Sequence, residues 1–481
     1  MILIHGAKVV RPKTFAAEAL DVIVEGDTIK DLVAPGSVKG DGMERVDATG
    51  RALMPGLVNG HNHATANLAK GLFDRYNLEL YLTAVPWSTG RRTLEDKALS
   101  ATLGAAEMAR KGCTAAYDMF AEFPLPTVEG MAAVAEAYAK VGLRAVIAPQ
   151  ITDKSYWEAV PGLADALPEP LRSEALKAKA APHEQSIEAC RKILAAWRHP
   201  REQVKPALGP SIPHHCSDEF LRECRDLARE HGLGMQMHVA ESKMQSIIAP
   251  KVYGHSLVAH LAKLEMLSPG FCVAHGVWLG DEDRQRLADA GASVSHNPGS
   301  NLKLGSGVAD MRRMLAAGIN VAVGTDGTAC SDNLNAFEAM RLACYLSRVK
   351  DHSVGEWISA REAFHAATEG GAKALGFDRI GRIEKGWKAD LVFLDLSALH
   401  YVPLNDLAQQ IVFGEDGTGV EHVMAGGRFI VRDRKVLGVD VEKLRREAEE
   451  AMVRLRAANA EAKAFAEKLL PYVGRFCTGL H

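Results

Sequence analysis

Apolar and polar positions in the middle of the chain, residues 55–375, alternate between short apolar runs and longer amphipathic segments. Eight apolar runs follow one another here: ALMPGLVNGHNH, CTAAYDMF, GLRAVIAPQI, VKPALGPSI, GLGMQMHVAE, GFCVAHGVW, ASVSHNPG and INVAVGTDG. Segments with helical periodicity, such as LEDKALSATLGAAEMARKG and DEFLRECRDLAREHG, separate them. Eight strand–helix units in succession predict an α/β fold, the (β/α)8 TIM barrel. An insertion at about 153–203, between the third and fourth runs, predicts extra helices.

The two ends of the chain have a different pattern. Residues 1–54 alternate short β-prone runs with turns, and the same texture returns in residues 376–440. We therefore predict a small β-sandwich domain built from both termini. Residues 441–481 are expected to form a C-terminal helix and tail, with one helix from about Val441 to Leu470, because that stretch is rich in Ala, Glu, Lys, Arg and Leu.

Composition and charge narrow the possible functions. The chain is 47% hydrophobic, and its 57 basic and 60 acidic residues give a net charge of −3, which provides no field for nucleic acid or an anionic membrane. No apolar stretch approaches the ~18 residues of a membrane span, and the start, MILIHGAKVV, has no signal-peptide features. The eight cysteines show no Cys-x-x-Cys spacing, as expected for free thiols in the cytoplasm. We expect a cytoplasmic protein with a small-molecule substrate and no nucleic-acid or membrane partner.

Histidine and acidic residues stand at the carboxyl ends of five of the eight runs. The first run ends in His61 and His63, the fifth in His238 with Glu241 three residues later, the sixth in His275, the seventh in His296 and the eighth in Asp326. A lone histidine is more often a packing residue than a ligand. Because the chemistry of TIM barrels is located at the carboxyl ends of the strands, five such ends together predict a metal centre.

The residue types fit a catalytic divalent ion. Zinc accepts imidazole nitrogen and carboxylate oxygen and keeps a position for water in catalytic sites. Three nitrogens and one oxygen would come from His61, His63, His238 and Asp326. A metal lowers the pKa of its water toward neutrality; Asp326 could accept the proton, His275 could orient the nucleophile, and Glu241 could act as general acid and base on a substrate nitrogen. We expect one zinc ion, with iron and manganese as alternatives because they accept the same ligands.

The order His-x-His, His-x-x-Glu, His and Asp resembles the amidohydrolase superfamily. More narrowly, it resembles the mononuclear branch of methylthioadenosine and adenosylhomocysteine deaminases, nucleobase deaminases and triazine chlorohydrolases. The similarity extends from LMPGLVNGHNH through SHNPGSNLKLGSGVADM and VGTDGTACSDN to GRIEKGWKADLVFLDL. It implies the same four ligands, Glu241 and His275 as the acid–base pair, and a composite β-sandwich from both termini. Binuclear members of the superfamily usually bridge their two metals through a modified lysine at the end of strand four. Here Lys205 lies at the start of the fourth run rather than at its end, so a single metal ion is expected. Related barrels often form homo-oligomers, and we expect one here.

The substrate is expected to be an amino-substituted N-heterocycle, such as a purine base, a pterin or a similar cyclic amidine. Nucleoside deaminases of this branch usually carry Gly-Pro-His-Ala-Pro-Tyr-Thr after strand four, where this chain has Ser211 in place of the histidine, and Trp87 is not followed by their Pro-Glu motif. These differences favour a smaller ring than a nucleoside. Trp87 could stack on that ring or simply pack at the barrel mouth, and His214 and His215 could face the pocket or the surface. The candidate substrate contacts are Trp87, Gln150, Ser211, His214, His215 and His296.

Other functions stay open. The first alternatives are a triazine-type hydrolase that expels chloride or an alkylamine, and a methylthioadenosine or adenosylhomocysteine deaminase. Product analysis for chloride against ammonia separates chlorohydrolase from deaminase. A barrel kept as a non-catalytic scaffold is disfavoured, because all four expected ligands are present together with Glu241.

Overall fold

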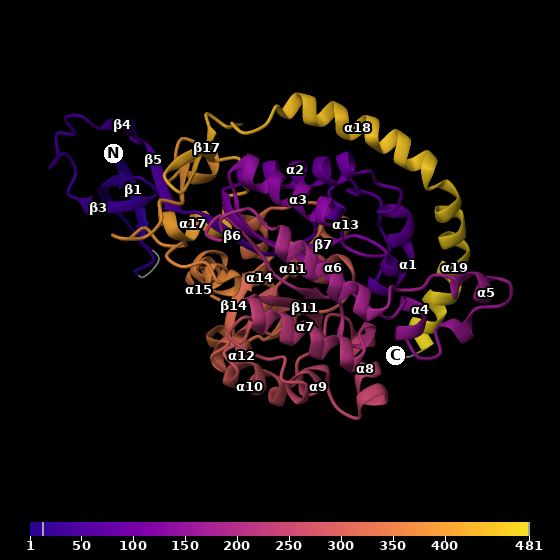
Figure 1. The fold of residues 1–481 in the computed structure, drawn as a ribbon. Coiled ribbons are helices and arrows are strands. Elements are labelled where there is room, and N and C mark those ends of the chain that lie inside the picture. Colours follow the sequence, from indigo (N-terminus) through magenta and orange to yellow (C-terminus); the bar gives the residue numbers. More distant parts are fainter. Residues whose placement is uncertain (12–13, 480–481) are drawn as a thin grey trace.

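The computed structural model describes residues 1–11 and 14–479 and has a mixed α/β architecture (Figure 1). Each of the eight predicted apolar runs contains a strand of one of two parallel sheets. The first sheet has the order β10-β8-β7-β6, with β9 paired to β8, and the second has the order β11-β12-β13-β14. The strands are β6 (Leu57–Asn62), β7 (Cys113–Ala121), β8 (Arg144–Ile151), β9 (Val204–Pro206), β10 (Gly209–Pro210), β11 (Met235–Val239), β12 (Phe271–His275), β13 (Ser293–His296) and β14 (Asn320–Val323).

These strands are short and buried on both faces. In β7, every residue from Cys113 to Phe120 is buried, as expected for parallel strands with helices around them. The two sheets also meet each other at their edges. An isolated parallel bridge pairs Leu208 with Met235, and the Asp326 N–H donates to the His61 carbonyl at 2.9 Å.

Helices follow the strands and cover the sheets, and their ends carry the expected capping residues. Thr93 and Asp96 form a capping box at the start of α2, while Ser217 caps α7 and Gly232 ends it with a left-handed backbone. The helices of this region are α1 (Leu78–Ser88), α2 (Leu94–Arg110), α3 (Val128–Val141), α7 (Asp218–His231), α8 (Lys243–Tyr253), α9 (Leu257–Lys263), α10 (Asp281–Asp289), α11 (Pro298–Lys303), α12 (Met311–Ala316), α13 (Thr328–Ser331), α14 (Ala336–Lys350), α15 (Ala360–His365) and α16 (Gly371–Leu375). The predicted insertion is helical and contains α4 (Tyr156–Ala159), α5 (Leu171–Ala175) and α6 (His183–Ala196).

Strands from both termini form one nine-stranded sheet, of order β18-β17-β16-β15-β5-β1-β2-β3 with β4 paired to β1. N-terminal β5 joins C-terminal β15 in antiparallel pairing, which confirms that the two ends of the chain build one β unit. The strands are β1 (Ile2–Arg11), β2 (Ala16–Glu25), β3 (Thr28–Val33), β4 (Glu44–Asp47), β5 (Arg51–Pro55), β15 (Leu391–Asp395), β16 (Val420–Ala425), β17 (Arg428–Arg432) and β18 (Lys435–Val436). The short helix α17 (Leu407–Phe413) lies between β15 and β16.

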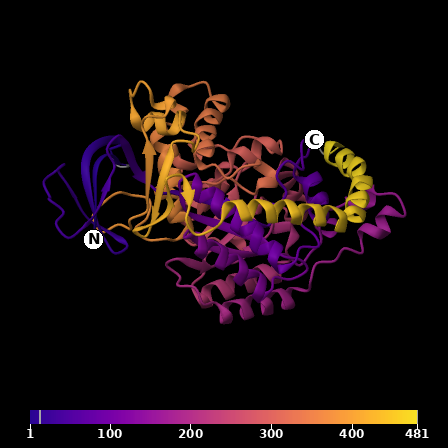
Figure 2. The same cartoon turned by 90° about the horizontal axis from the view of Figure 1, so that it is seen from above.

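The C-terminal segment differs from the prediction of one helix ending near Leu470. It forms two helices, α18 (Val441–Ala458) and α19 (Ala460–Gly479). The helix is interrupted at Asn459, whose side-chain amide donates to the Gly90 carbonyl at 3.1 Å and so ties the junction to the end of α1. Figures 1 and 2 show α18 running along the outside of the molecule from the β-rich end, so that α19 comes to lie beside α1.

Two further sequence expectations bear on the environment of the chain. All eight cysteines are buried free thiols, as expected. Within residues 1–11 and 14–479, no helix combines the length and the apolar character needed to cross a membrane.

Candidate metal centre and substrate cavity

Four side chains from three strand ends converge on one point. His61 belongs to β6 and His63 follows it directly, His238 belongs to β11, and Asp326 lies three residues after β14. The His63 and His238 Nε2 atoms are 3.2 Å apart. The Asp326 Oδ1 atom lies 3.3 Å from His63 Nε2 and 3.5 Å from His61 Nε2. The sequence-predicted ligand set is therefore brought together by the fold.

Hydrogen bonds fix the tautomers of the three rings. Their Nδ1 atoms face oxygen acceptors: Gln236 Oε1 at 2.7 Å for His61, the Met119 carbonyl at 2.7 Å for His63, and the Ser211 carbonyl at 3.0 Å for His238. Because a carbonyl oxygen can only accept, we assign the proton of each ring to Nδ1. Each Nε2 then carries a lone pair directed at the other two and at the Asp326 carboxylate.

This donor set fits a divalent cation. Nitrogen and oxygen ligands about 2.0–2.1 Å from a tetrahedral metal lie about 3.3 Å from one another, and the three measured separations are 3.2, 3.3 and 3.5 Å. Among the residues that the structure describes, His61 Nε2 is buried with no hydrogen-bond partner. Converging lone pairs beside a carboxylate repel one another unless a cation lies between them, so the arrangement is a candidate metal site.

Protonation favours the same conclusion. Burial alone would raise the pKa of Asp326, but the adjacent His61 and His63 imidazoles hold that pKa well below the ordinary value. Burial lowers the pKa of His238 well below its ordinary value, so the ring is neutral. The pKa of His63 is raised, because the Asp326 carboxylate outweighs burial. A proton and a cation thus compete for the space between His63 and Asp326.

His275, at the end of β12, faces the same point from another side. Its Nδ1 atom pairs with Asn301 Oδ1 at 2.8 Å, which leaves the Nε2 lone pair directed inward, 3.8 Å from Asp326 Oδ2. Both His275 and Asp326 have left-handed backbones, with φ of 76° and 62°. Such angles are uncommon outside glycine and occur often at functional sites.

Glu241 lies just after β11 and is 2% exposed. Its Oε1 atom is 3.6 Å from His275 Nε2, and its Oε2 atom finds no hydrogen-bond partner within the described part of the chain. Burial raises the pKa of Glu241 well above its ordinary value, with additional effects from Asp326 and Glu79. Burial therefore favours the neutral carboxylic acid, the form that has a proton to donate.

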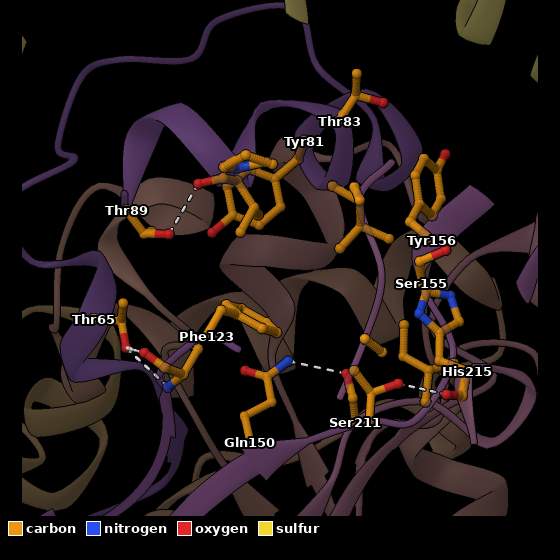
Figure 3. Close-up of a pocket in the computed structure, with 18 of the residues that line it drawn as sticks. Thr65, Tyr81, Thr83, Thr89, Phe123, Gln150, Ser155, Tyr156, Ser211 and His215 are labelled. Atoms are coloured by element: carbon orange, nitrogen blue, oxygen red, sulfur yellow. Dashed lines mark hydrogen bonds between the residues drawn. The ribbon is translucent and has the colours of Figure 1, made fainter. Parts of the chain in front are cut away.

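A cavity of about 580 Å³ opens beside these groups. His63, His238, Glu241 and Asp326 are among its lining residues. Figure 3 shows Gln150 and Ser211 on one side of the cavity, with Tyr81 and Thr83 of α1 across from them. Gln150 Nε2 donates to Ser211 Oγ at 3.0 Å, which leaves the Gln150 amide oxygen as an acceptor for a ligand.

The other candidate substrate contacts divide into two groups. Gln150, Ser211 and His215 line the cavity, whereas Trp87, His214 and His296 are not among its described lining residues. Trp87 packs against Phe73, with ring centroids 5.5 Å apart, so the structure favours its packing alternative. His214 lies edge-on to His215 at 4.6 Å. His296 is 1% exposed, and burial, with a contribution from His275, lowers its pKa to about 4.

Several residues at the centre were not predicted. Gln236 orients His61, Asn301 orients His275, and Ser300 Oγ donates to Asp326 Oδ2 at 2.6 Å. Gln236 could have been found from its spacing, because it precedes His238 by two residues and shares its face of β11. Ser300 and Asn301 lie on α11, and no spacing in the sequence relates them to the strand ends.

Comparison with known proteins gives consistent matches over most of the chain. Residues 52–430 match the sequence model of the amidohydrolase family. The chain is 35% identical over 432 residues to the 5-methylthioadenosine/S-adenosylhomocysteine deaminase of Thermococcus kodakarensis, covering 89% of this chain and 94% of that protein. It is 31% identical over 438 residues to the 5'-deoxyadenosine deaminase of Methanosarcina mazei, covering 91% and 93%.

Solved structures agree with the sequence matches. The zinc-bound structure of an adenosine deaminase from Xanthomonas campestris has a TM-score of 0.83 at 27% identity, covering 95% of this chain and 98% of that one. The atrazine chlorohydrolase of Arthrobacter aurescens has a TM-score of 0.83 at 24% identity, a likeness of fold alone.

Proposed function

The chain belongs to the amidohydrolase family, and from this premise we propose that it catalyses the hydrolytic deamination of an amino-substituted N-heterocycle. One observation carries the proposal: the inward-facing Nε2 atoms of His61, His63 and His238 meet the Asp326 carboxylate beside Glu241, a buried carboxyl whose pKa is raised. Purine bases, pterins and similar cyclic amidines are the substrate class. The products are the oxo-heterocycle and ammonia.

We propose one divalent ion, held by His61, His63, His238 and Asp326. Zinc is the first choice because the similar adenosine deaminase structure from Xanthomonas campestris holds zinc, and iron and manganese remain alternatives. Such an ion lowers the pKa of water, so that a nucleophile is available at neutral pH.

The side chains around the ion supply the proton transfers. Glu241 donates its proton to the ring nitrogen next to the carbon that water attacks. His275 Nε2 and Asp326 Oδ2, which are 3.8 Å apart, receive the proton that the water gives up. That proton then passes to the departing amino group, which leaves as ammonia, while the hydroxyl on the attacked carbon returns a proton to Glu241 and the ring nitrogen keeps its own, which gives the oxo-heterocycle.

Three cavity residues would orient the ring. Ser211 donates or accepts through its hydroxyl, the Gln150 amide oxygen accepts, and His215 lines the same wall. The pKa of His215 is lowered to about 3, because of burial and the nearby Lys154. The neutral imidazole can therefore either donate or accept at a ring edge.

A nucleoside deaminase of the methylthioadenosine or adenosylhomocysteine type is the second candidate. It is favoured by the 35% identity to the Thermococcus kodakarensis enzyme and by a cavity of about 580 Å³, which accepts more than a single ring. Triazine chlorohydrolase activity has only the fold likeness in its favour. A non-catalytic scaffold is disfavoured by the complete donor set.

We also propose the finer architecture. Residues 55–375 would close into one (β/α)8 barrel, supported by the Leu208–Met235 bridge and the Asp326-to-His61 backbone hydrogen bond that join the two parallel sheets. Residues 1–54 and 376–440 would fold as a β-sandwich around a shared buried cluster that includes Val22, Leu53 and Phe393. Residues 441–481 would be a separate helical segment. A cytoplasmic location agrees with the free thiols, and a homo-oligomer is kept from the family resemblance.

The test is a substrate screen with purified, zinc-loaded protein. Aminated purines, pterins, pyrimidines and triazines are assayed for ammonia release, and chlorotriazines for chloride. Ammonia from at least one class, lost on chelation and restored by zinc, is expected. Ammonia from none of them, or chloride alone, would contradict the proposal.

A further inference from the structure

We infer that the cavity has an outer compartment, walled by the C-terminal helix α19, which selects amino-heterocycles that carry an apolar substituent. The inference rests on the proposed deaminase function and names the substrate class more closely. It concerns the part of the cavity that α19 lines, where we place none of the proposed proton transfers.

The outer compartment is built from four separate segments. Its large apolar side chains are Tyr81 of α1, Phe123 after β7, Trp157 of α4, and Phe465 and Leu469 of α19. Figure 3 shows Phe123 and Tyr156 flanking the space between α1 and the Gln150–Ser211 pair. Polar groups that could recognise a ring and large apolar side chains thus line the same cavity.

The sequence of α19 explains how it forms this wall. Ala462, Phe465, Ala466 and Leu469 all line the cavity, and their spacing of i, i+3, i+4 and i+7 places them on one helix face. Alternating with them, Lys463, Ala464 and Lys468 are exposed. The next turn continues the apolar face at Val473, which packs in a cluster with Trp157 and Leu163. The helix therefore joins the insertion and α1 in closing the cavity.

Charged side chains that line this region are already engaged. Glu122 forms an ion pair with Lys97 and accepts from Thr127, while Lys179 pairs with Glu158.

The neighbouring polar groups are likewise occupied. Lys154 Nζ donates to the Cys216 carbonyl at 3.2 Å, and the Thr83 hydroxyl donates to the Glu79 carbonyl at 2.9 Å. A hydroxylated substituent such as ribose would lose its hydrogen bonds to water here and would have to share protein groups that are already hydrogen-bonded. An apolar substituent would instead gain by leaving water.

The size of the cavity agrees. Pockets of roughly 300–1,000 Å³ accommodate ligands well beyond one ring system, and this one measures about 580 Å³. A bare aminated ring would leave the apolar end facing only water.

The experiment compares matched probes and matched variants. The probes are adenine, 9-benzyladenine and adenosine, together with melamine and N-benzylmelamine, and kcat/KM for ammonia release is measured for each. Ala462→Phe fills the compartment, and Ala464→Phe makes the same change on the exposed face of α19. Phe465→Ala enlarges the compartment. Melting temperatures show whether each variant is folded.

In the wild-type protein we expect the benzyl derivative of the accepted ring to exceed both the bare ring and the ribosyl form by at least ~10-fold. Ala462→Phe should remove most of that preference while changing kcat/KM for the bare ring less than about twofold, and Ala464→Phe should leave the preference intact. Should Ala462→Phe fail to fold, Phe465→Ala provides the test, because it enlarges the compartment. In this variant, kcat/KM for a 9-(naphthylmethyl) derivative should rise relative to that for the benzyl derivative.

The failures are distinguishable. Ammonia from none of these probes and none of the wider screen would refute the deaminase function itself. Ammonia release with a preference for the bare or ribosyl form, or an equal effect of Ala462→Phe on every probe, would overturn the outer-compartment inference and leave the deaminase function standing.

Discussion

Glu241→Gln separates proton transfer from every other contribution of this side chain. Glu241 is buried, and burial raises its pKa, which favours the neutral acid. Glutamine has nearly the same shape and the same zero charge, so the metal ligands and the 3.6 Å neighbour His275 meet an equivalent group. Only the transferable proton is lost. Positioned general acids contribute about 10²–10⁴-fold to rate, or about 2.7–5.4 kcal/mol at 1.36 kcal/mol per tenfold.

We therefore expect kcat for ammonia release to fall about 10²–10⁴-fold, while KM changes little and metal content by elemental analysis stays at the wild-type value. Glu129→Gln, an identical change at an exposed position in the first turn of α3, is the control and should retain full activity. If Glu241→Gln kept more than a tenth of the wild-type kcat, Glu241 would not be the proton donor. If the variant lost its metal along with its activity, the carboxyl would be an ionised ligand, and the reasoning from its burial would be wrong.

Three further outcomes follow from the geometry. Chelation should abolish turnover and lower the melting temperature, and zinc should restore both; an unchanged melting temperature with no bound metal would count against the site. Asn301→Ala should lower kcat about 10–100-fold with metal retained, because His275 loses the acceptor that fixes its tautomer, whereas Asn301→Asp should recover part of the loss; equal activity of both variants and wild type would show that Asn301 does not position His275. Because burial lowers the His215 pKa to about 3 from 6.5, the unfolded chain takes up a proton first as pH falls, and stability declines below pH 6.5. Between pH 7.5 and 5, the free energy of unfolding measured by urea titration should therefore fall by about 2 kcal/mol less in His215→Gln than in wild type. An identical pH dependence of both proteins would argue against a neutral buried ring.

The parallel strands were predictable because each is an apolar run with a polar residue at its carboxyl end. The alternation with amphipathic helices located all eight strand segments, and the similar texture of the two termini predicted that they share one β unit. The break at Asn459 was not predictable. Nothing in EKLRREAEEAMVRLRAANAEAKAF disfavours a continuous helix, and the interruption coincides with a tertiary contact, the hydrogen bond from Asn459 to the Gly90 carbonyl.

The same distinction applies to the site. The sequence placed His61, His63, His238 and Asp326 together, because strand ends converge by topology rather than by side-chain detail. The orientation of individual side chains could not be predicted in this way. The packing of Trp87 against Phe73, and the contact of Asn301 with His275, depend on loop and helix paths that hydrophobic periodicity does not encode. Resemblance to a family supplied the roles of the ligands, but not the cavity wall contributed by α19.

The centre itself opposes the stability of the fold that holds it. Two non-glycine residues with left-handed backbone, His275 and Asp326, cost on the order of 1–3 kcal/mol each. Buried Nε2 atoms of His61 and His275 and the Oε2 atom of Glu241 lack hydrogen-bond partners within residues 1–11 and 14–479, and each such group adds a desolvation penalty. A cation would satisfy the lone pairs of its ligands, among them His61 Nε2, whereas only a bound substrate nitrogen satisfies the Glu241 proton. The metal should therefore stabilise the folded protein strongly, whereas the Glu241 carboxyl should keep an unsatisfied hydrogen-bonding group until a substrate binds. A bound ring should consequently raise the melting temperature of the metal-loaded protein less in Glu241→Ala than in wild type, even though the substitution does not touch a metal ligand.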